Sequence, residues 1–270
     1  MPPLDPIPSP DLTPPPEVVP QPIQRNENVD LLDVFLILLV AMGGFFFVGG
    51  IATVIYMVAH RSQHLNAAAL GDALSRNPFF IVPTQLAVYL FVIGFMAFLV
   101  RIRHGVSLSK AIHWNLPYAR RALFALLGGI GLALFSDIGE VVLNRWIPKS
   151  LPITEYFRDR PSALLLGAFG ILVAPLMEEI MFRGFLYPAL ARWTGVFSSV
   201  VITALAFTML HGAQLGYSWA PLLLILVVGL ALTITRVVTE SVATGVVMHM
   251  AYNFTLLLQT YIATHGFRQM

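Results

Sequence analysis

The chain has 270 residues, of which 57% are hydrophobic and 11% charged, and its formal net charge is +2. Soluble domains carry about 25% charged residues, so this composition excludes an ordinary soluble protein. Several apolar runs reach the roughly 20 residues of a transmembrane helix, which also excludes a transmembrane barrel built from short alternating strands. The absence of cysteine excludes disulfides, thiol catalysis and cysteine-bound metals.

Residues 1–29 are expected to form a disordered, Pro-rich cytoplasmic tail. They hold ten of the nineteen prolines and show almost no regular apolar pattern. A Pro-rich segment that binds a partner is the alternative. The stretch lacks the basic and then apolar regions of a cleaved signal peptide.

Seven apolar segments follow, and they predict an all-α fold, a polytopic transmembrane helical bundle. An eighth span is the alternative if a re-entrant or interfacial stretch hides one. The predicted segments lie at about residues 34–59, 79–100, 122–143, 162–190, 197–213, 219–236 and 240–262.

The loop between the second and third segments predicts the orientation of the bundle. It is basic and holds no acid, which marks it as cytoplasmic by the positive-inside rule. Counting helices from this loop places the N-terminus and the turns at 191–196 and 237–240 on the cytoplasmic side, and the loop at 144–161 outside. The compact chain and its short loops favour an integral protein of a bacterial inner membrane. The basic residues of the loop are Arg101, Arg103, Lys110, Arg120 and Arg121.

Polar residues within the last four apolar segments predict a functional site inside the membrane. Ionisable groups at such depth are costly and usually functional. Helical rise places them at similar depths, about 15–22 Å from the cytoplasmic turns, although three separate helices supply them. The residues concerned are Glu178, Glu179, Arg183, His211, His249 and Asn253.

Helical spacing divides the two adjacent glutamates into different roles. Glu179 and Arg183 are four residues apart, so they share a face and can form an ion pair. Glu178 is turned by about 100° from Glu179, which leaves it free for chemistry. His249 and Asn253 share a face in the same way.

These residue types suit hydrolysis. A carboxylate in an apolar pocket can act as a general base on water, and His211 can share or orient that water. His249 and Asn253 can donate hydrogen bonds to a developing oxyanion. Phe207 precedes His211 by four residues, so its ring can pack beside the imidazole and help to exclude water. The alternative is a divalent metal such as zinc, held by Glu178, His211 and His249 from separate helices.

Three motifs together resemble the CPBP intramembrane proteases, the family of the CAAX prenyl proteases, abortive-infection proteins and bacteriocin-processing enzymes. The motifs are EExxxR from Glu178 to Arg183, FxxxH from Phe207 to His211, and HxxxN from His249 to Asn253. They occur in this order in three of the last four hydrophobic segments, and the resemblance covers about residues 162–262.

The resemblance implies an intramembrane endopeptidase, with a protease core expected over 144–265. Residues 30–143 are compatible with it and are expected to form N-terminal transmembrane helices. It implies that Glu178 activates water with His211, that Glu179 is a supporting carboxylate, and that His249 and Asn253 stabilise the oxyanion. Arg183 is then the structural partner of Glu179. The family is described both as glutamate-dependent and as metal-dependent, so the cofactor is either none or a divalent metal.

The expected partners are the lipid bilayer and a membrane-associated peptide or protein substrate, with no nucleic acid. Neither the oligomeric state nor a prenylated substrate is predicted. A proton- or cation-coupled transporter is the alternative from another class, because Glu and His also form proton relays. It is disfavoured because polar residues at depth occur only in the second half, whereas transporter sites have counterparts in both halves. A catalytically silent scaffold is a third alternative, but it would not need buried charges.

Overall fold

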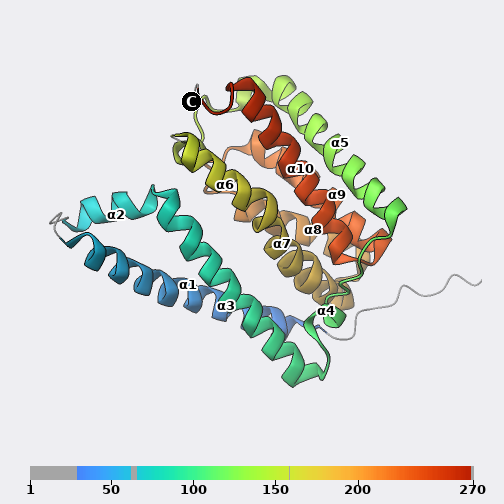
Figure 1. Ribbon diagram of the computed structural model, residues 1–270. Coiled ribbons are helices and arrows are strands. Elements are labelled where there is room, and N and C mark those ends of the chain that lie inside the picture. Colours follow the sequence, from blue (N-terminus) through green and yellow to red (C-terminus); the bar gives the residue numbers. More distant parts are fainter. Residues whose placement is uncertain (1–28, 62–65, 158, 269–270) are drawn as a thin grey trace, which may run out of the picture.

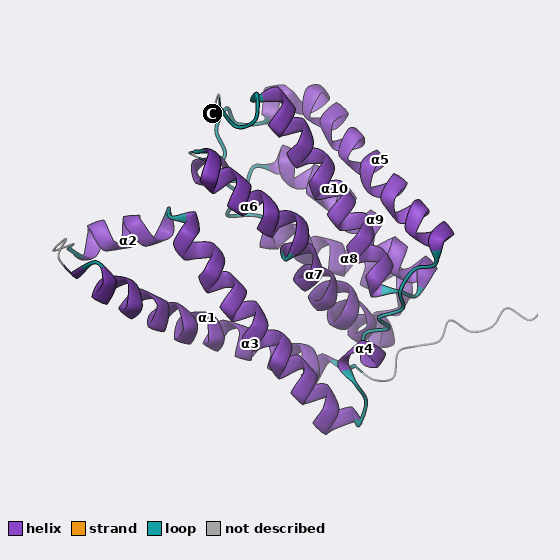
Figure 2. Cartoon of the chain, viewed as in Figure 1, coloured by secondary structure: helices purple, strands orange, loops and turns teal. Residues whose placement is uncertain are grey.

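The computed structural model describes residues 29–61, 66–157 and 159–268. The predicted tail over 1–29 therefore lies outside the described residues, except for Val29, which is buried. Every regular element in the described part of the chain is a helix (Figure 2). The predicted all-α class is confirmed.

The first three helices form an arm at the side of the molecule, with the short α2 joining the ends of the long α1 and α3 (Figure 1). Asp30 caps the start of α1 with a reciprocal pair of hydrogen bonds to Asp33, and Asn77 caps α3 just before Pro78. Gly105 ends α3 with φ of 70°, a conformation that glycine adopts at little cost. The bounds are α1 Leu31–Ala59, α2 Ala67–Ser75 and α3 Pro78–His104.

The remaining helices form a bundle in which α10 lies between α5 and α6 (Figure 1). Their bounds are α4 Leu108–Ala111, α5 Ala119–Leu143, α6 Arg160–Leu172, α7 Ala174–Glu179, α8 Tyr187–Leu210, α9 Trp219–Thr239 and α10 Val242–Ala263. Two short 3₁₀ turns, η2 Asn144–Trp146 and η3 Pro152–Tyr156, lie between α5 and α6, and a π-helical turn, η4 Ile180–Leu186, joins α7 to α8.

Prolines explain why the segment that carries the two glutamates is broken into short pieces. Pro175 and Pro188 lack the N–H that a continuous α-helical hydrogen-bond pattern would use, so α6 ends at Leu172 and the pattern changes again where the π turn meets α8 at Tyr187. The wide π turn lies between these breaks, directly after Glu179. Such turns are rare and occur frequently at functional sites.

Within the part of the chain that the structure describes, five helical runs are long and apolar enough to cross a membrane, so the chain is an integral membrane protein. The predicted segments 162–190 and 197–213 lie in one of these runs, Arg160–Leu210, which Gly195 interrupts with φ of 77°. The segment at 240–262 corresponds to α10, which is not among the five because its His, Asn and Gln lower its hydropathy. The count of seven spans stays a prediction.

Two packed clusters hold the molecule together. The first cluster includes Val92 and Met96 of the arm together with Met177, Ile180 and Phe185 of the second half. In the second, α5, α9 and α10 pack together through Ala125, Ala133, Val228, Leu232 and Met248. The glutamates lie next to Met177 and His249 lies next to Met248 in the sequence, so the predicted site lies between the two clusters.

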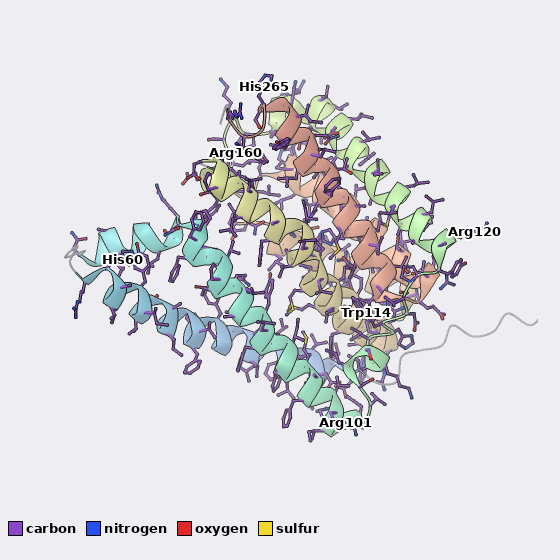
Figure 3. The ribbon with its side chains drawn as sticks, viewed as in Figure 1. His60, Arg101, Trp114, Arg120, Arg160 and His265 are labelled. Carbon is purple, nitrogen blue, oxygen red and sulfur yellow. The ribbon has the colours of Figure 1, made fainter. Side chains whose placement is uncertain are left out.

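Segments predicted to share the cytoplasmic side do gather at one end of the bundle. Arg103 binds Asp30 at 2.9 Å, Arg192 donates to the Val29 carbonyl at 3.1 Å, and Ser241 donates to the Asn115 carbonyl. Figure 3 places Arg101, Trp114 and Arg120 toward this end, and Arg160 and His265 at the opposite one. The location of this end in the cytoplasm stays a prediction.

Candidate active site

Glu179 is a fully buried carboxylate that binds two partners through one oxygen. Its Oε1 accepts from Arg183 Nη1 at 2.9 Å and lies 3.1 Å from His249 Nδ1. The predicted ion pair is therefore present, and both of its side chains have 0% exposure. Burial of a charge is tolerated only with such pairing, so Glu179 and Arg183 stabilise each other.

Arg183 also binds α9, which the sequence did not predict. Its Nε donates to Thr233 Oγ1 at 3.2 Å and its Nη2 donates to the Gly229 carbonyl at 2.9 Å. The guanidinium group lies 4.6 Å from the centre of the Phe207 ring, a cation–π contact. Arg183 thus joins η4 to α8 and α9. The only sequence signal was the spacing of Gly229 and Thr233, which are four residues apart in an apolar helix.

Gly245 allows α10 to approach the buried carboxylate. A Cβ atom at this position would lie 2.8 Å from Glu179 Oε2, closer than real Cβ contacts. That oxygen has no hydrogen-bond partner among the described residues. The close approach brings His249, one turn later on α10, within hydrogen-bond distance of Glu179.

His249 lies between the two glutamates. Because carboxylates only accept, we assign the proton on Nδ1 as the donor to Glu179, and this fixes the orientation of the ring. Nε2 then faces Glu178 Oε2 at 3.8 Å, too long for a direct hydrogen bond. Glu178 retains 14% side-chain exposure, compared with 0% for Glu179. The predicted difference between the glutamates is present in their burial and partners.

His211 is at the end of α8, where its Nδ1 lies 3.0 Å from the carbonyl of Phe207. This contact makes Nδ1 the donor and leaves Nε2 as the acceptor. Phe207 brings the two histidines together, since its ring centre is 4.8 Å from that of His211 and 5.8 Å from that of His249. The FxxxH motif therefore lies beside the HxxxN motif.

Asn253 is directed to α6. Its Nδ2 donates to the Gly170 carbonyl at 2.7 Å, and the side chain is partly buried. The structure places it one turn beyond His249 on α10, as its spacing predicts, with this hydrogen bond joining α10 to α6 rather than to another of the predicted site residues.

The alternative zinc site is not assembled in this arrangement. Among the described residues, no group of three or more His, Asp or Glu side chains lies where it could hold a metal ion. His249 uses Nδ1 on Glu179, and His211 uses Nδ1 on its own helix. Nε2 of each ring therefore stays free to act as a ligand, and the zinc alternative stays a prediction.

The comparisons with known proteins bear on the second half of the chain. A family model described as type II CAAX prenyl endopeptidase, Rce1-like, matches residues 160–255. The matched region holds all three motifs. Neither the comparison with curated proteins nor that with solved structures gave a match. The family supports an intramembrane endopeptidase in general. The match confirms that residues 160–255 are similar to the CPBP proteases, through the domain of the Rce1-like type II CAAX prenyl endopeptidases.

Proposed function

We propose that this protein hydrolyses a peptide bond of a membrane-associated peptide or protein, with Glu178 as the general base on water. The observation that carries the proposal is the unequal environment of the two glutamates. Glu179 is fully buried and bound to Arg183 and His249, whereas Glu178 is partly exposed and faces His249 at 3.8 Å. One carboxylate is held in place and the other is accessible to water.

Glu178 takes a proton from the attacking water, and the water oxygen bonds to the carbonyl carbon of the substrate. The second hydrogen of that water is accepted by Nε2 of His211. When the tetrahedral intermediate collapses, the carbon–nitrogen bond breaks and Glu178 returns its proton to the leaving amine. A positioned base of this kind contributes about 10²–10⁴-fold to the rate.

His249 and Asn253 serve the oxyanion. In this proposal His249 donates from both ring nitrogens, from Nδ1 to Glu179 and from Nε2 to the oxyanion. Asn253 has two amide hydrogens, of which one binds Gly170 and the other is available for the same oxygen. Donors aimed at developing charge in a water-poor site are usually the largest catalytic term.

We further propose that the protein lies in a bacterial inner membrane with its N-terminus in the cytoplasm, because the basic residues gather at the end that holds Asp30 and Arg192. We divide the chain into N-terminal transmembrane helices over 30–143 and a protease core over 144–265. The family description names a prenyl endopeptidase, so the cleavage assay includes a prenylated and an unprenylated peptide.

The test uses purified full-length protein in detergent and a fluorogenic CAAX peptide, with and without a prenyl group. Wild type is expected to cleave at least one of the two peptides and Glu178→Ala to cleave neither. Activity is expected to survive chelation in protein whose metal content has been measured. Equal cleavage by both proteins, or no cleavage by wild type, would contradict the endopeptidase proposal. Loss on chelation with recovery on zinc would contradict metal-free activation of water.

A further inference from the structure

Arg236, in the last turn of α9, is a buried cation without a partner. Only 5% of the residue is exposed, and its Nε is fully buried. Among the described residues, no hydrogen bond or ion pair reaches its guanidinium group. By contrast, Arg183 is buried with three hydrogen-bond partners, and one of them is the Glu179 carboxylate. The two arginines therefore differ in the pairing that makes burial of a charge tolerable.

The surroundings of Arg236 compensate its charge only in part. Its guanidinium carbon lies 6.0 Å from the centre of the Tyr187 ring, at the outer limit of a cation–π contact. Glu240, four residues later, is exposed and forms no ion pair with it. The C-terminal end of a helix favours a cation, but this effect is smaller than the cost of an unpaired buried charge. An anion would complete the arrangement.

Arg236 lies one helical turn from the contacts that hold the active site. It follows Thr233 by three residues on α9, a rise of about 4.5 Å, and Thr233 accepts from Arg183. Tyr187 follows Arg183 by four residues. A peptide that extends from the site toward this end of the bundle would reach Arg236 within a few residues, since an extended chain covers about 3.3 Å per residue.

The turn that follows Arg236 is covered by the loop before α5. The backbone N–H of Val242 donates to the His113 carbonyl at 3.3 Å, and Asn115 Nδ2 donates to the Glu240 carbonyl at 3.3 Å. The bundle therefore closes around this turn. A lipid headgroup at the surface is for this reason a poorer source of the anion than a group that enters the bundle with the substrate.

We propose that Arg236 binds a carboxylate of the peptide substrate. A guanidinium group can hold a carboxylate through two parallel hydrogen bonds, and Arg236 has its donors available for them. The carboxylate is either the C-terminus of the peptide or an Asp or Glu side chain near the scissile bond. This inference rests on the proposed function and adds to it a class of substrate, a peptide with a carboxylate that Arg236 selects.

The test measures cleavage of three fluorogenic peptides with the same apolar sequence. The first has a free C-terminal carboxylate, the second has a C-terminal amide, and the third has the amide and one Asp next to it. For wild type, KM is expected to be about ten- to a hundredfold lower for the first or the third peptide than for the second, at similar kcat. The peptide that is preferred identifies the source of the carboxylate.

Arg236→Gln is expected to lose this preference and to cleave all three peptides with the KM that wild type shows for the plain amide. Its melting temperature in detergent is expected to equal or exceed that of wild type, because the substitution removes an uncompensated buried charge. A merely structural arginine would not produce this pair of results.

Arg120→Gln is the matched control, because Arg120 is exposed at the same end of the bundle (Figure 3). It removes the same charge and is expected to keep the wild-type preference. The inference is overturned if wild type shows no preference, if Arg236→Gln keeps it, or if Arg236→Gln raises KM equally for all three peptides. The last result is the one that a lipid anion would give.

The failure of this inference and the failure of the proposed function give different results. If Glu178→Gln is inactive and Arg236→Gln keeps the wild-type preference, only the role of Arg236 is wrong. If wild type cleaves none of the peptides, or Glu178→Gln cleaves them as wild type does, the proposed function is wrong and the inference about Arg236 is overturned with it.

Discussion

Two adjacent residues of the same type have opposite requirements in this molecule. The Glu179 side chain is fully buried and binds Arg183 and His249. The Glu178 side chain is partly exposed, and its nearest charged partner is His249 at 3.8 Å. The spacing of Glu179 and Arg183 made this division predictable, because residues four apart share a helix face. We therefore expect the two glutamates to differ in what their substitution damages.

Glu179→Gln is expected to destabilise the protein by about 3–5 kcal/mol, because it leaves the buried charge of Arg183 without its counter-charge. The measurement is the unfolding of the purified protein in detergent, induced by heat or by denaturant. Glu178→Gln is the matched control and is expected to unfold as wild type does. Equal stability of Glu179→Gln and wild type would show that the ion pair is not needed for folding.

At the scale of helices, the position of His249 depends on how closely α5 approaches α10. A Cβ atom on Gly129 of α5 would lie 2.3 Å from the Met248 carbonyl oxygen, next to His249 in the chain. A Cβ atom on Gly131, two residues later in α5, would have no such neighbour within 4 Å. Small residues permit such close contacts between membrane helices.

Gly129→Ala is expected to cost about 1–3 kcal/mol and to lower cleavage activity, because the two helices must separate and α10 moves with His249. Gly131→Ala is expected to be neutral or to stabilise the helix by up to about 1 kcal/mol. Melting temperature and kcat of both variants check this. Similar behaviour of the two alanine variants would mean that close packing of α5 on α10 does not position the site.

The sequence predicted contacts within a helix better than contacts between helices. The pairing of Arg183 with Thr233 and Gly229 depends on how α9 packs against η4, which no local pattern encodes. The partner of Asn253 could not be predicted either, because it is a backbone carbonyl. Gly170 lies in the last turn of α6, which ends at Leu172, and its carbonyl accepts this hydrogen bond.

At the scale of the whole molecule, the proposed orientation can be tested directly because the chain contains no cysteine. Cysteine introduced at Lys149, in the loop before α6, is expected to react with an impermeant maleimide on intact cells. Cysteine at Lys110, in the basic loop, is expected to react only after the cells are permeabilised. Both positions are exposed in the structure. The reverse pattern would invert the orientation.

The prediction that the N-terminus, the basic loop and the turn at 191–196 share one side of the membrane depends only on successive helices running in opposite directions. The ion pair of Asp30 with Arg103 and the hydrogen bond of Arg192 to Val29 agree with that prediction. The number of spans is harder to predict from composition. The polar residues that make α10 a candidate for catalysis also lower its hydropathy, and the run Arg160–Leu210 is interrupted at Gly195 rather than by a polar loop.

The central claim is that Glu178 activates water while Glu179 maintains the structure, and the cleavage rate of Glu178→Gln tests it most directly. The account predicts that kcat falls about 10²–10⁴-fold, with the melting temperature unchanged, because a general base is lost and no buried pair is broken. A Glu178→Gln variant that is folded and cleaves the peptide at the wild-type rate would contradict it.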